Sequence, residues 1–156
     1  CEPDEAIDGD RAVREVRSWA QTAGGTAGRL GPLTGFYDAF GGPGTLEENV
    51  ALLERTIGYD ARKIHYHKGW FQVTLPTDAS GVGPIAILRL DGDWYASTRI
   101  CLEHLYDLVV PSGFVIVDDY GTYDGCRRAV DEFIAGRGLD VQLQPVDSDC
   151  VYWVKD

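Results

Sequence analysis

The stretch Ile85-Ala-Ile-Leu-Arg-Leu-Asp-Gly-Asp93 decides the fold of this chain. It is an apolar run that ends abruptly in two carboxylates separated by one glycine. A second run, Phe114-Val-Ile-Val-Asp-Asp119, repeats this pattern further along the chain. Both runs are short, rich in β-branched residues and bounded by Gly or Pro, so both are predicted to be buried strands.

Four carboxylates follow these two strands: Asp91, Asp93, Asp118 and Asp119. In an open α/β sheet, ligands bind beyond the carboxyl ends of the strands, and two adjacent parallel strands would bring the four side chains together there. Like charges that close raise each other's pKa, and a hard divalent cation with oxygen ligands relieves their repulsion. The sequence therefore predicts a cation site. The alternative is that these carboxylates cap the following helix and face solvent.

Length and charge restrict the class of protein. A chain of 156 residues is predicted to form one domain, residues 1–156. Its net charge of −11 argues against nucleic acid and against an anionic membrane surface as partners. No apolar run approaches the roughly 20 residues that span a bilayer, and no signal peptide is visible, which predicts a cytoplasmic protein. A homo-oligomer is an open alternative to a monomer.

The cysteines and the amino end carry less information. Four scattered cysteines without a CxxC spacing predict free thiols rather than a zinc site. The chain begins at Cys1 and contains no methionine. This predicts a processed chain, a fragment of a longer protein, or an incomplete sequence.

Strand and helix patterns alternate along the chain. Helices are predicted at residues 11–23, 45–57, 97–108 and 124–135, the second beginning with a capping box formed by Thr45 and Glu48. Strands are predicted at 33–37, 63–67, 85–90, 114–117, 140–144 and 150–155, the last two as an antiparallel hairpin. Residues 68–71 are predicted to be a loop, 72–84 irregular and 111–113 a turn. This order predicts a doubly wound α/β sheet with an antiparallel edge.

Several motifs of this chain occur together in one protein family. They are Leu90-Asp-Gly-Asp-Trp-Tyr-Ala-Ser-Thr98, Pro111-Ser-Gly-Phe-Val-Ile-Val-Asp-Asp-Tyr-Gly121, Cys126-Arg-Arg-Ala-Val-Asp-Glu-Phe133, Phe36-Tyr-Asp-Ala-Phe-Gly41, Lys68-Gly-Trp-Phe71, Thr74-Leu-Pro76 and Tyr152-Trp153. With these motifs the chain, from Leu33 to its carboxyl end, resembles the macrocin O-methyltransferase family. Members are S-adenosylmethionine-dependent and Mg²⁺-dependent enzymes that methylate sugar hydroxyls of bacterial natural products. The resemblance implies a Rossmann-like class I methyltransferase sheet, both cofactors and a small-molecule natural-product substrate.

The resemblance also implies roles for single residues. The metal ligands would be Asp91, Asp118 and Asp119. The cofactor would be held by Asp38, Gly69, Trp70 and Asp91. For Asp38, at the end of a predicted strand, binding of ribose hydroxyls competes with a loop Asx-turn. Trp70, Phe71, Trp94 and Tyr95 are expected either to line an adenine or substrate pocket or to pack in the core.

Asp93 is the candidate general base. A sugar hydroxyl has a high pKa, which coordination to a metal ion lowers. A carboxylate within hydrogen-bond reach then removes the proton. The alternative is that Asp93 interacts favourably with the dipole of the helix that begins shortly after it. Both roles are compatible.

The amino end departs from the family pattern. A member would have a first strand and a turn of the form Glu-x-Gly-x-x-x-Gly-Gly, whose glycines let the backbone approach the cofactor. Cys1–Asp10 stands in that place, with only Glu2 and Gly9 matching. Either the first strand lies outside this sequence, or the turn is degenerate and the acidic residues Asp4, Glu5, Asp8 and Asp10 repel the carboxylate of the cofactor.

Three functions remain open. The leading hypothesis is a natural-product O-methyltransferase. The second is a methyltransferase-fold enzyme repurposed for a non-methylating, metal-dependent step such as cyclisation or rearrangement. The third is a catalytically inactive partner subunit. The missing glycine turn favours the second and third, whereas the intact acidic cluster argues against the third.

Overall fold

A computed structural model describes residues 4–22 and 45–156 of the chain. The strand predicted at 33–37 and the predicted ribose ligand Asp38 lie outside the described residues. The chain divides into two compact units, one formed by Cys1–Val13 with Gly69–Asp156 and the other by Arg14–Lys68.

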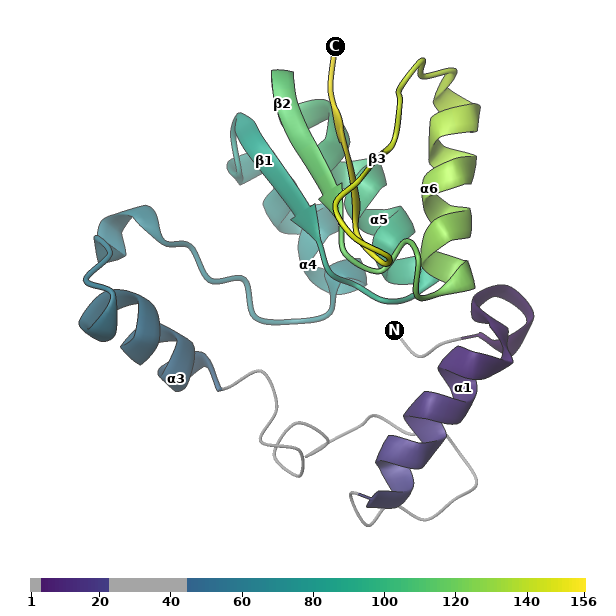
Figure 1. The fold of residues 1–156 in the computed structure, drawn as a ribbon. Coiled ribbons are helices and arrows are strands. Elements are labelled where there is room, and N and C mark those ends of the chain that lie inside the picture. Colours follow the sequence, from purple (N-terminus) through teal and green to yellow (C-terminus); the bar gives the residue numbers. More distant parts are fainter. Residues whose placement is uncertain (1–3, 23–44) are drawn as a thin grey trace. The chain divides into compact units, whose positions relative to one another are not determined.

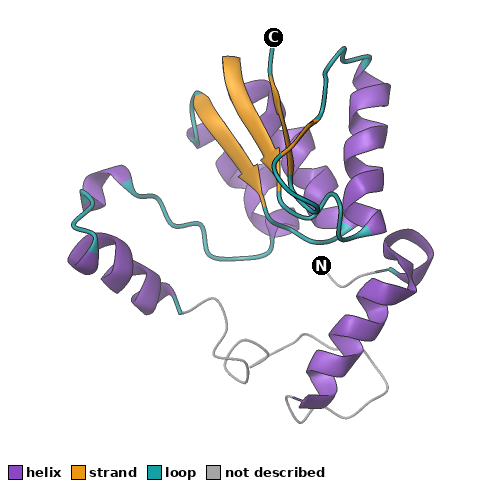
Figure 2. Cartoon of the chain, viewed as in Figure 1, coloured by secondary structure: helices purple, strands orange, loops and turns teal. Residues whose placement is uncertain are grey.

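The first unit is built on a four-stranded mixed sheet with the order β1-β2-β4-β3 (Figures 1 and 2). Strand β1 (Ile85–Leu90) is parallel to β2 (Val109–Val117), β2 is antiparallel to β4 (Val151–Val154), and β4 is antiparallel to β3 (Gln144–Pro145). The predicted bounds of β1, the parallel pairing of β1 with β2 and the antiparallel pairing of the last two strands are confirmed. The strand predicted at 140–144 is wrong over residues 140–143, because only Gln144 and Pro145 pair with β4. The chain has a mixed α/β fold.

Two helices cover one face of this sheet. Helix α5 (Tyr95–Leu105), continued by a 3₁₀ turn at Tyr106–Leu108, lies behind the strands, and α6 (Asp124–Arg137) packs against α5 (Figure 1). The strands contribute the buried side chains Leu88, Leu90, Val115, Val117 and Trp153. The helices contribute Cys101, Leu102, Cys126, Ala129, Val130 and Phe133 at helical spacing. Burying each large apolar side chain contributes about 1.5–3 kcal/mol, so this layer holds the unit together.

The opposite face of the sheet carries an exposed apolar row. Ile87 is paired with Phe114 and Phe114 with Val154, so the three side chains lie side by side across three strands. Their exposed fractions are 62%, 42% and 42% in that order, whereas their immediate neighbours Leu88, Val115 and Trp153 are buried. The period-two alternation of strands therefore separates a covered face from one that the described residues leave open.

At the amino end of β2, the side chain of Lys155 joins the end of the chain to the segment between α5 and β2. Its ammonium donates hydrogen bonds to the carbonyl oxygens of Tyr106, Asp107 and Val109, at 3.1, 3.4 and 2.7 Å, and lies 4.9 Å from the centre of the Tyr106 ring. Arg137, the last residue of α6, binds both carboxylate oxygens of Asp107. The ammonium of Lys155 thus gives backbone carbonyls of the 3₁₀ turn and of the first residue of β2 a hydrogen-bond donor.

The amino-terminal segment caps helix α5 of this unit. Helix α1 (Glu5–Thr22) begins earlier than predicted and is kinked at Gly9, where φ is 83°. Asp8 is only 4% exposed, and its carboxylate accepts hydrogen bonds from the backbone N–H groups of Tyr95, at 2.6 Å, and Asp4, at 2.7 Å. An acidic side chain at the first residue of a helix is stabilising. Asp8 therefore has a structural partner inside the protein.

Tight contact explains one glycine of α6. A Cβ atom at Gly125 would lie 1.7 Å from the Oδ1 atom of Asp8. Glycine is therefore required where α6 begins against the amino-terminal segment.

Residues 109–113 extend β2 beyond the predicted strand. The turn predicted at 111–113 is wrong, because the backbone of Ser112 donates to the Lys155 carbonyl at 2.7 Å and the backbone of Lys155 donates to the Gly113 carbonyl at 2.9 Å. The pairing of the chain around β4 thus overrides the turn signal of the Pro-Ser-Gly sequence.

Helix α4 (Phe71–Asp78), followed by a 3₁₀ turn at Ala79–Gly81, replaces the irregular segment predicted there. The backbone N–H groups of Val73 and Thr74 both donate to the carbonyl of Trp70, which closes the first turn. This helix contains Pro76 and has no buried residue. It therefore lacks the apolar periodicity from which a helix is predicted.

In the second unit, the capping box between Thr45 and Glu48 is confirmed at the start of α3 (Leu46–Val50), which continues as a π-helix over Ala51–Thr56. The strand predicted at 63–67 is wrong. A 3₁₀ turn at Ala61–Lys63 ends there, and residues 64–67 form no regular element. The turn is capped by the carboxylate of Asp60, which accepts a hydrogen bond from the backbone N–H of Arg62.

Candidate functional site

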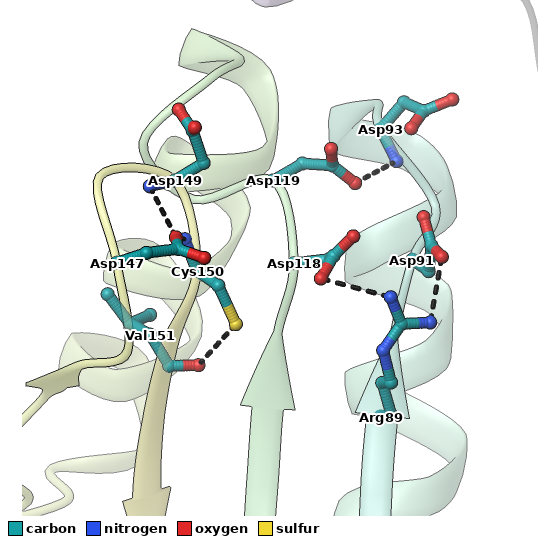
Figure 3. Close-up of polar contacts among 9 residues, drawn as sticks. All are labelled: Arg89, Asp91, Asp93, Asp118, Asp119, Asp147, Asp149, Cys150 and Val151. Atoms are coloured by element: carbon teal, nitrogen blue, oxygen red, sulfur yellow. Dashed lines mark hydrogen bonds and ion pairs between the residues drawn. The ribbon is translucent and has the colours of Figure 1, made fainter.

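The candidate site lies at the carboxyl ends of β1 and β2 (Figure 3). The backbone pairing continues one step past both strands, because the N–H of Asp118 donates to the carbonyl of Leu90 at 2.9 Å. Asp91 and Asp118 therefore leave adjacent strands at the same level. This is the edge at which open α/β sheets bind their ligands.

A tight turn directs Asp93 back toward β2. The Gly92 carbonyl accepts hydrogen bonds from the backbone of Trp94, at 2.6 Å, and from the hydroxyl of Ser97. Asp93 has a positive φ of 57°, a conformation that costs energy for a residue other than glycine. In this conformation its backbone N–H donates to the Oδ2 atom of Asp119 at 3.3 Å. Such backbone strain is common at functional sites.

Three carboxylates converge beyond the strands. Asp91, Asp93 and Asp119 each offer one oxygen atom, and these atoms lie within 4.8 Å of one another. Burial, followed by the negative charges of Asp93 and Asp91, raises the pKa of Asp119 to about 7. The group therefore carries more negative charge than its surroundings neutralise. An all-oxygen donor set of this charge suits a hard divalent cation.

Asp118, the fourth carboxylate, has a different partner. Arg89 binds the Oδ2 atom of Asp91 at 2.8 Å and the Oδ1 atom of Asp118 at 3.0 Å (Figure 3). The structure thus brings the predicted ligands Asp91 and Asp119 together with the predicted base Asp93, while Asp118 faces the guanidinium. Sequence reasoning missed Arg89. Arg89 could have been identified from the alternation of side chains along a strand, because this alternation places Arg89 and Asp91 on one face of β1.

The residues predicted to bind the cofactor are less closely grouped. Gly69 and Trp70 precede α4, and Trp70 is 54% exposed. A ring carbon of Phe71 lies 3.7 Å from where a Cβ atom at Gly92 would be, so the start of α4 contacts the Gly92 turn. Asp38, outside the described residues, is not placed.

The aromatic residues beyond the strands have structural partners. Trp94 is buried, and its ring centre lies 4.9 Å from that of Tyr123. The hydroxyl of Tyr95 donates to Glu132 at 2.6 Å, and that of Tyr120 donates to Asp131 at 2.8 Å. Burial and the neighbouring Asp131 raise the pKa of Tyr120 to about 12. For Trp94 this favours core packing over a pocket-lining role.

The described cysteines offer no activated nucleophile. Cys101, Cys126 and Cys150 are buried free thiols, as expected. Burial raises the pKa of Cys101 and of Cys126 to about 12, so both remain protonated at neutral pH. Across residues 4–22 and 45–156, no helix combines the length and apolarity needed to cross a bilayer.

Two relatives share substantial sequence with the chain. Demethyldecarbamoylnovobiocin O-methyltransferase of Streptomyces niveus is 40% identical over 107 residues, which are 69% of this chain and 40% of the relative. A tetracenomycin rhamnosyl 4'-O-methyltransferase of Streptomyces olivaceus is 40% identical over 108 residues, again 69% of this chain and 40% of the relative. The chain thus spans about two-fifths of the length of these curated relatives.

Solved structures show the same relationship. The O-methyltransferase NovP is similar with a TM-score of 0.67 and 35% identity, over 84% of this chain and 54% of NovP. The calicheamicin methyltransferase CalS11 is similar with a TM-score of 0.58 and 20% identity, over 81% of this chain and 52% of CalS11, which concerns the fold alone. The model of the Macrocin-O-methyltransferase (TylF) family matches residues 46–155, from the start of α3 to the residue after β4. The chain belongs to this family.

Proposed function

We propose that this chain catalyses transfer of a methyl group from S-adenosylmethionine to a hydroxyl, on a sugar of a bacterial natural product, with the help of Mg²⁺. The convergence of Asp91, Asp93 and Asp119 beyond two parallel strands carries the proposal. Relatives named for methylating a novobiocin precursor and a rhamnosyl-tetracenomycin support the class of acceptor. We also propose that residues 1–156 belong to one methyltransferase-like domain with a doubly wound, Rossmann-like sheet.

The carboxylates fit a magnesium ion. Asp91, Asp118 and Asp119 would hold it, since Asp118 uses only its Oδ1 atom for Arg89. Once bound, the ion lowers the pKa of a coordinated hydroxyl and neutralises the carboxylate charge. Asp93 receives the proton of the acceptor hydroxyl, because its side chain belongs to the same group of oxygens. Asp38, Gly69, Trp70 and Asp91 are proposed to contact S-adenosylmethionine.

Calorimetric titration with Mg²⁺ tests the metal site. The wild-type chain is expected to bind one ion, and Asp119→Asn to lose this binding. Asp140→Asn, an identical change at an exposed residue outside the site, is the matched control and should bind as the wild type does. Undiminished binding by Asp119→Asn would remove that residue from the site.

A second function is favoured by one observation. In the described amino-terminal residues, the buried carboxylate of Asp8 is a helix cap at Tyr95 and not part of a cofactor site. A metal-dependent step without methyl transfer is therefore the alternative. Titration with S-adenosylhomocysteine in the presence of Mg²⁺ separates the two. Binding of both ligands supports methyl transfer, whereas Mg²⁺ binding alone supports the alternative.

A further inference from the structure

We propose that Arg89 is a positioning residue for the metal site, which holds Asp91 and Asp118 with one oxygen of each turned toward the ion. This inference rests on the proposed Mg²⁺ site and adds the side chain that organises it. Arg89 is not a metal ligand, since a guanidinium has only donors and no acceptor.

The sheet register puts Arg89 between the two carboxylates. Arg89 pairs with Ile116 across the β1–β2 ladder. Asp91 follows Arg89 by two positions and Asp118 follows Ile116 by two, so the alternation of side chains places all four on one face. Figure 3 shows both carboxylates turned toward the guanidinium from their adjacent strands.

In the ion pairs with Arg89, Asp91 and Asp118 each use one of their two carboxylate oxygens. Nη1 of Arg89 binds Oδ2 of Asp91 at 2.8 Å, and Nη2 binds Oδ1 of Asp118 at 3.0 Å. Oδ1 of Asp91 and Oδ2 of Asp118 are the oxygens that these two ion pairs do not use. A planar guanidinium fixes the separation and orientation of two carboxylates at once, whereas an ammonium is a point charge on a flexible stem.

Arg89 also has an opposing effect, because a positive charge beside the site repels a metal ion. The Arg89 side chain is 52% exposed, so solvent screens this repulsion. Carboxylates that ligate metals are commonly oriented by such hydrogen bonds, whose loss typically weakens metal binding by about 10–100-fold. Replacing arginine by lysine separates the orienting effect from the repulsion. Lysine keeps the positive charge but lacks the planar guanidinium that binds two carboxylates at once.

The decisive experiment is calorimetric titration of Arg89→Lys with Mg²⁺ and with Mn²⁺. Arg89→Lys is expected to bind both ions about 10–100-fold more weakly than the wild type. Arg128→Lys is the matched control, since Arg128 forms an exposed ion pair with Glu132 on α6 and is expected to bind as the wild type does. Thermal unfolding of each variant without metal confirms that the fold is retained.

The outcomes distinguish this inference from the proposed function. Unchanged or tighter binding by Arg89→Lys, with wild-type binding intact, overturns the role of Arg89 and leaves the metal site standing. Absence of Mg²⁺ and Mn²⁺ binding in the wild type overturns the metal site and this inference together. Should Arg89→Lys not fold, Arg89→Gln replaces it, with weaker binding expected and equal or tighter binding again contradicting the role.

Discussion

The two ends of the β1–β2 strand pair differ in how their charged side chains are paired. At the amino end, the Lys155 ammonium is surrounded by three carbonyl oxygens and Arg137 is paired with Asp107. At the carboxyl end, four aspartates lie close together and Arg89 pairs with two of them, Asp91 and Asp118. Burial with neighbouring charge raises the pKa of Asp119 there to about 7. At the first end each of these cations has oxygen partners within the protein, whereas the second end keeps an excess of negative charge that a bound cation would neutralise.

The two ends of helix α6 differ in packing, and this difference gives the largest expected effect. Gly125→Ala places a methyl group 1.7 Å from Asp8 Oδ1, so Asp8 must withdraw from the backbone of Tyr95. We expect unfolding free energy to fall by about 3 kcal/mol. At the other end, Gly136→Ala meets nothing within 4 Å. It should be neutral or stabilising by up to about 1 kcal/mol.

Urea denaturation of both variants measures this difference. Equal destabilisation by the two substitutions would contradict the close packing of the amino-terminal segment against α6.

A smaller loss is expected at the amino end of the strands. Lys155→Met keeps an apolar stem over Tyr106 but leaves the carbonyls of Tyr106, Asp107 and Val109 without this donor. Loss of such partners costs about 2 kcal/mol. Thermal unfolding beside Lys63→Met, an exposed lysine expected to change stability by less than about 0.5 kcal/mol, checks the value. A Lys155→Met protein as stable as the wild type would show that water replaces the ammonium.

At the carboxyl end of the strands, a substitution is expected to increase stability. This is the smallest of the expected effects. The pKa of Asp119 is about 7 in the folded chain against an ordinary value of 3.8. The folded state therefore binds more protons than the unfolded state between these values, and the stability that protonated Asp119 contributes is lost as pH rises through about 7. Asp119→Asn removes the charge and should stabilise the metal-free chain by about 1 kcal/mol at pH 7.5.

Denaturation of wild type and Asp119→Asn at pH 4.5 and 7.5, without divalent ions, measures this effect. The gain should shrink at the lower pH. A variant less stable than the wild type at pH 7.5 would show that the acidic end is already neutralised.

Local signals predicted the parts of the fold that depend on short stretches. The bounds of β1 followed from its apolar run, and the capping box at Thr45 followed from the position of Glu48. Helix α4 was missed because none of its residues is buried, so it leaves no periodic apolar pattern. The start of β2 was missed because its pairing with the chain around Lys155 is a tertiary contact.

For the candidate site too, local signals predicted only the features that depend on short stretches of sequence. Strand ends in the sequence predicted Asp91, Asp93, Asp118 and Asp119 close together. The structure groups Asp91, Asp93 and Asp119 and pairs Asp118 with Arg89, which the sequence pattern had not indicated. The role of Asp8 was unpredictable from local pattern, because it caps a residue 87 positions away. An acidic stretch expected to repel a ligand supplies a buried carboxylate with a hydrogen-bonding partner instead. The roles of the aspartates in binding and catalysis stay predictions.

The left-handed backbone of Asp93 has a consequence for how such a sequence can change. At φ 57° a side chain strains the backbone, whereas glycine adopts this conformation freely. Aspartate and glycine codons differ at a single base, so a point mutation can delete this acid and relax the backbone at once. The proposed base would be lost by this route without a penalty in folding. Natural variants that lack the proposed activity are therefore expected among those with glycine at this position.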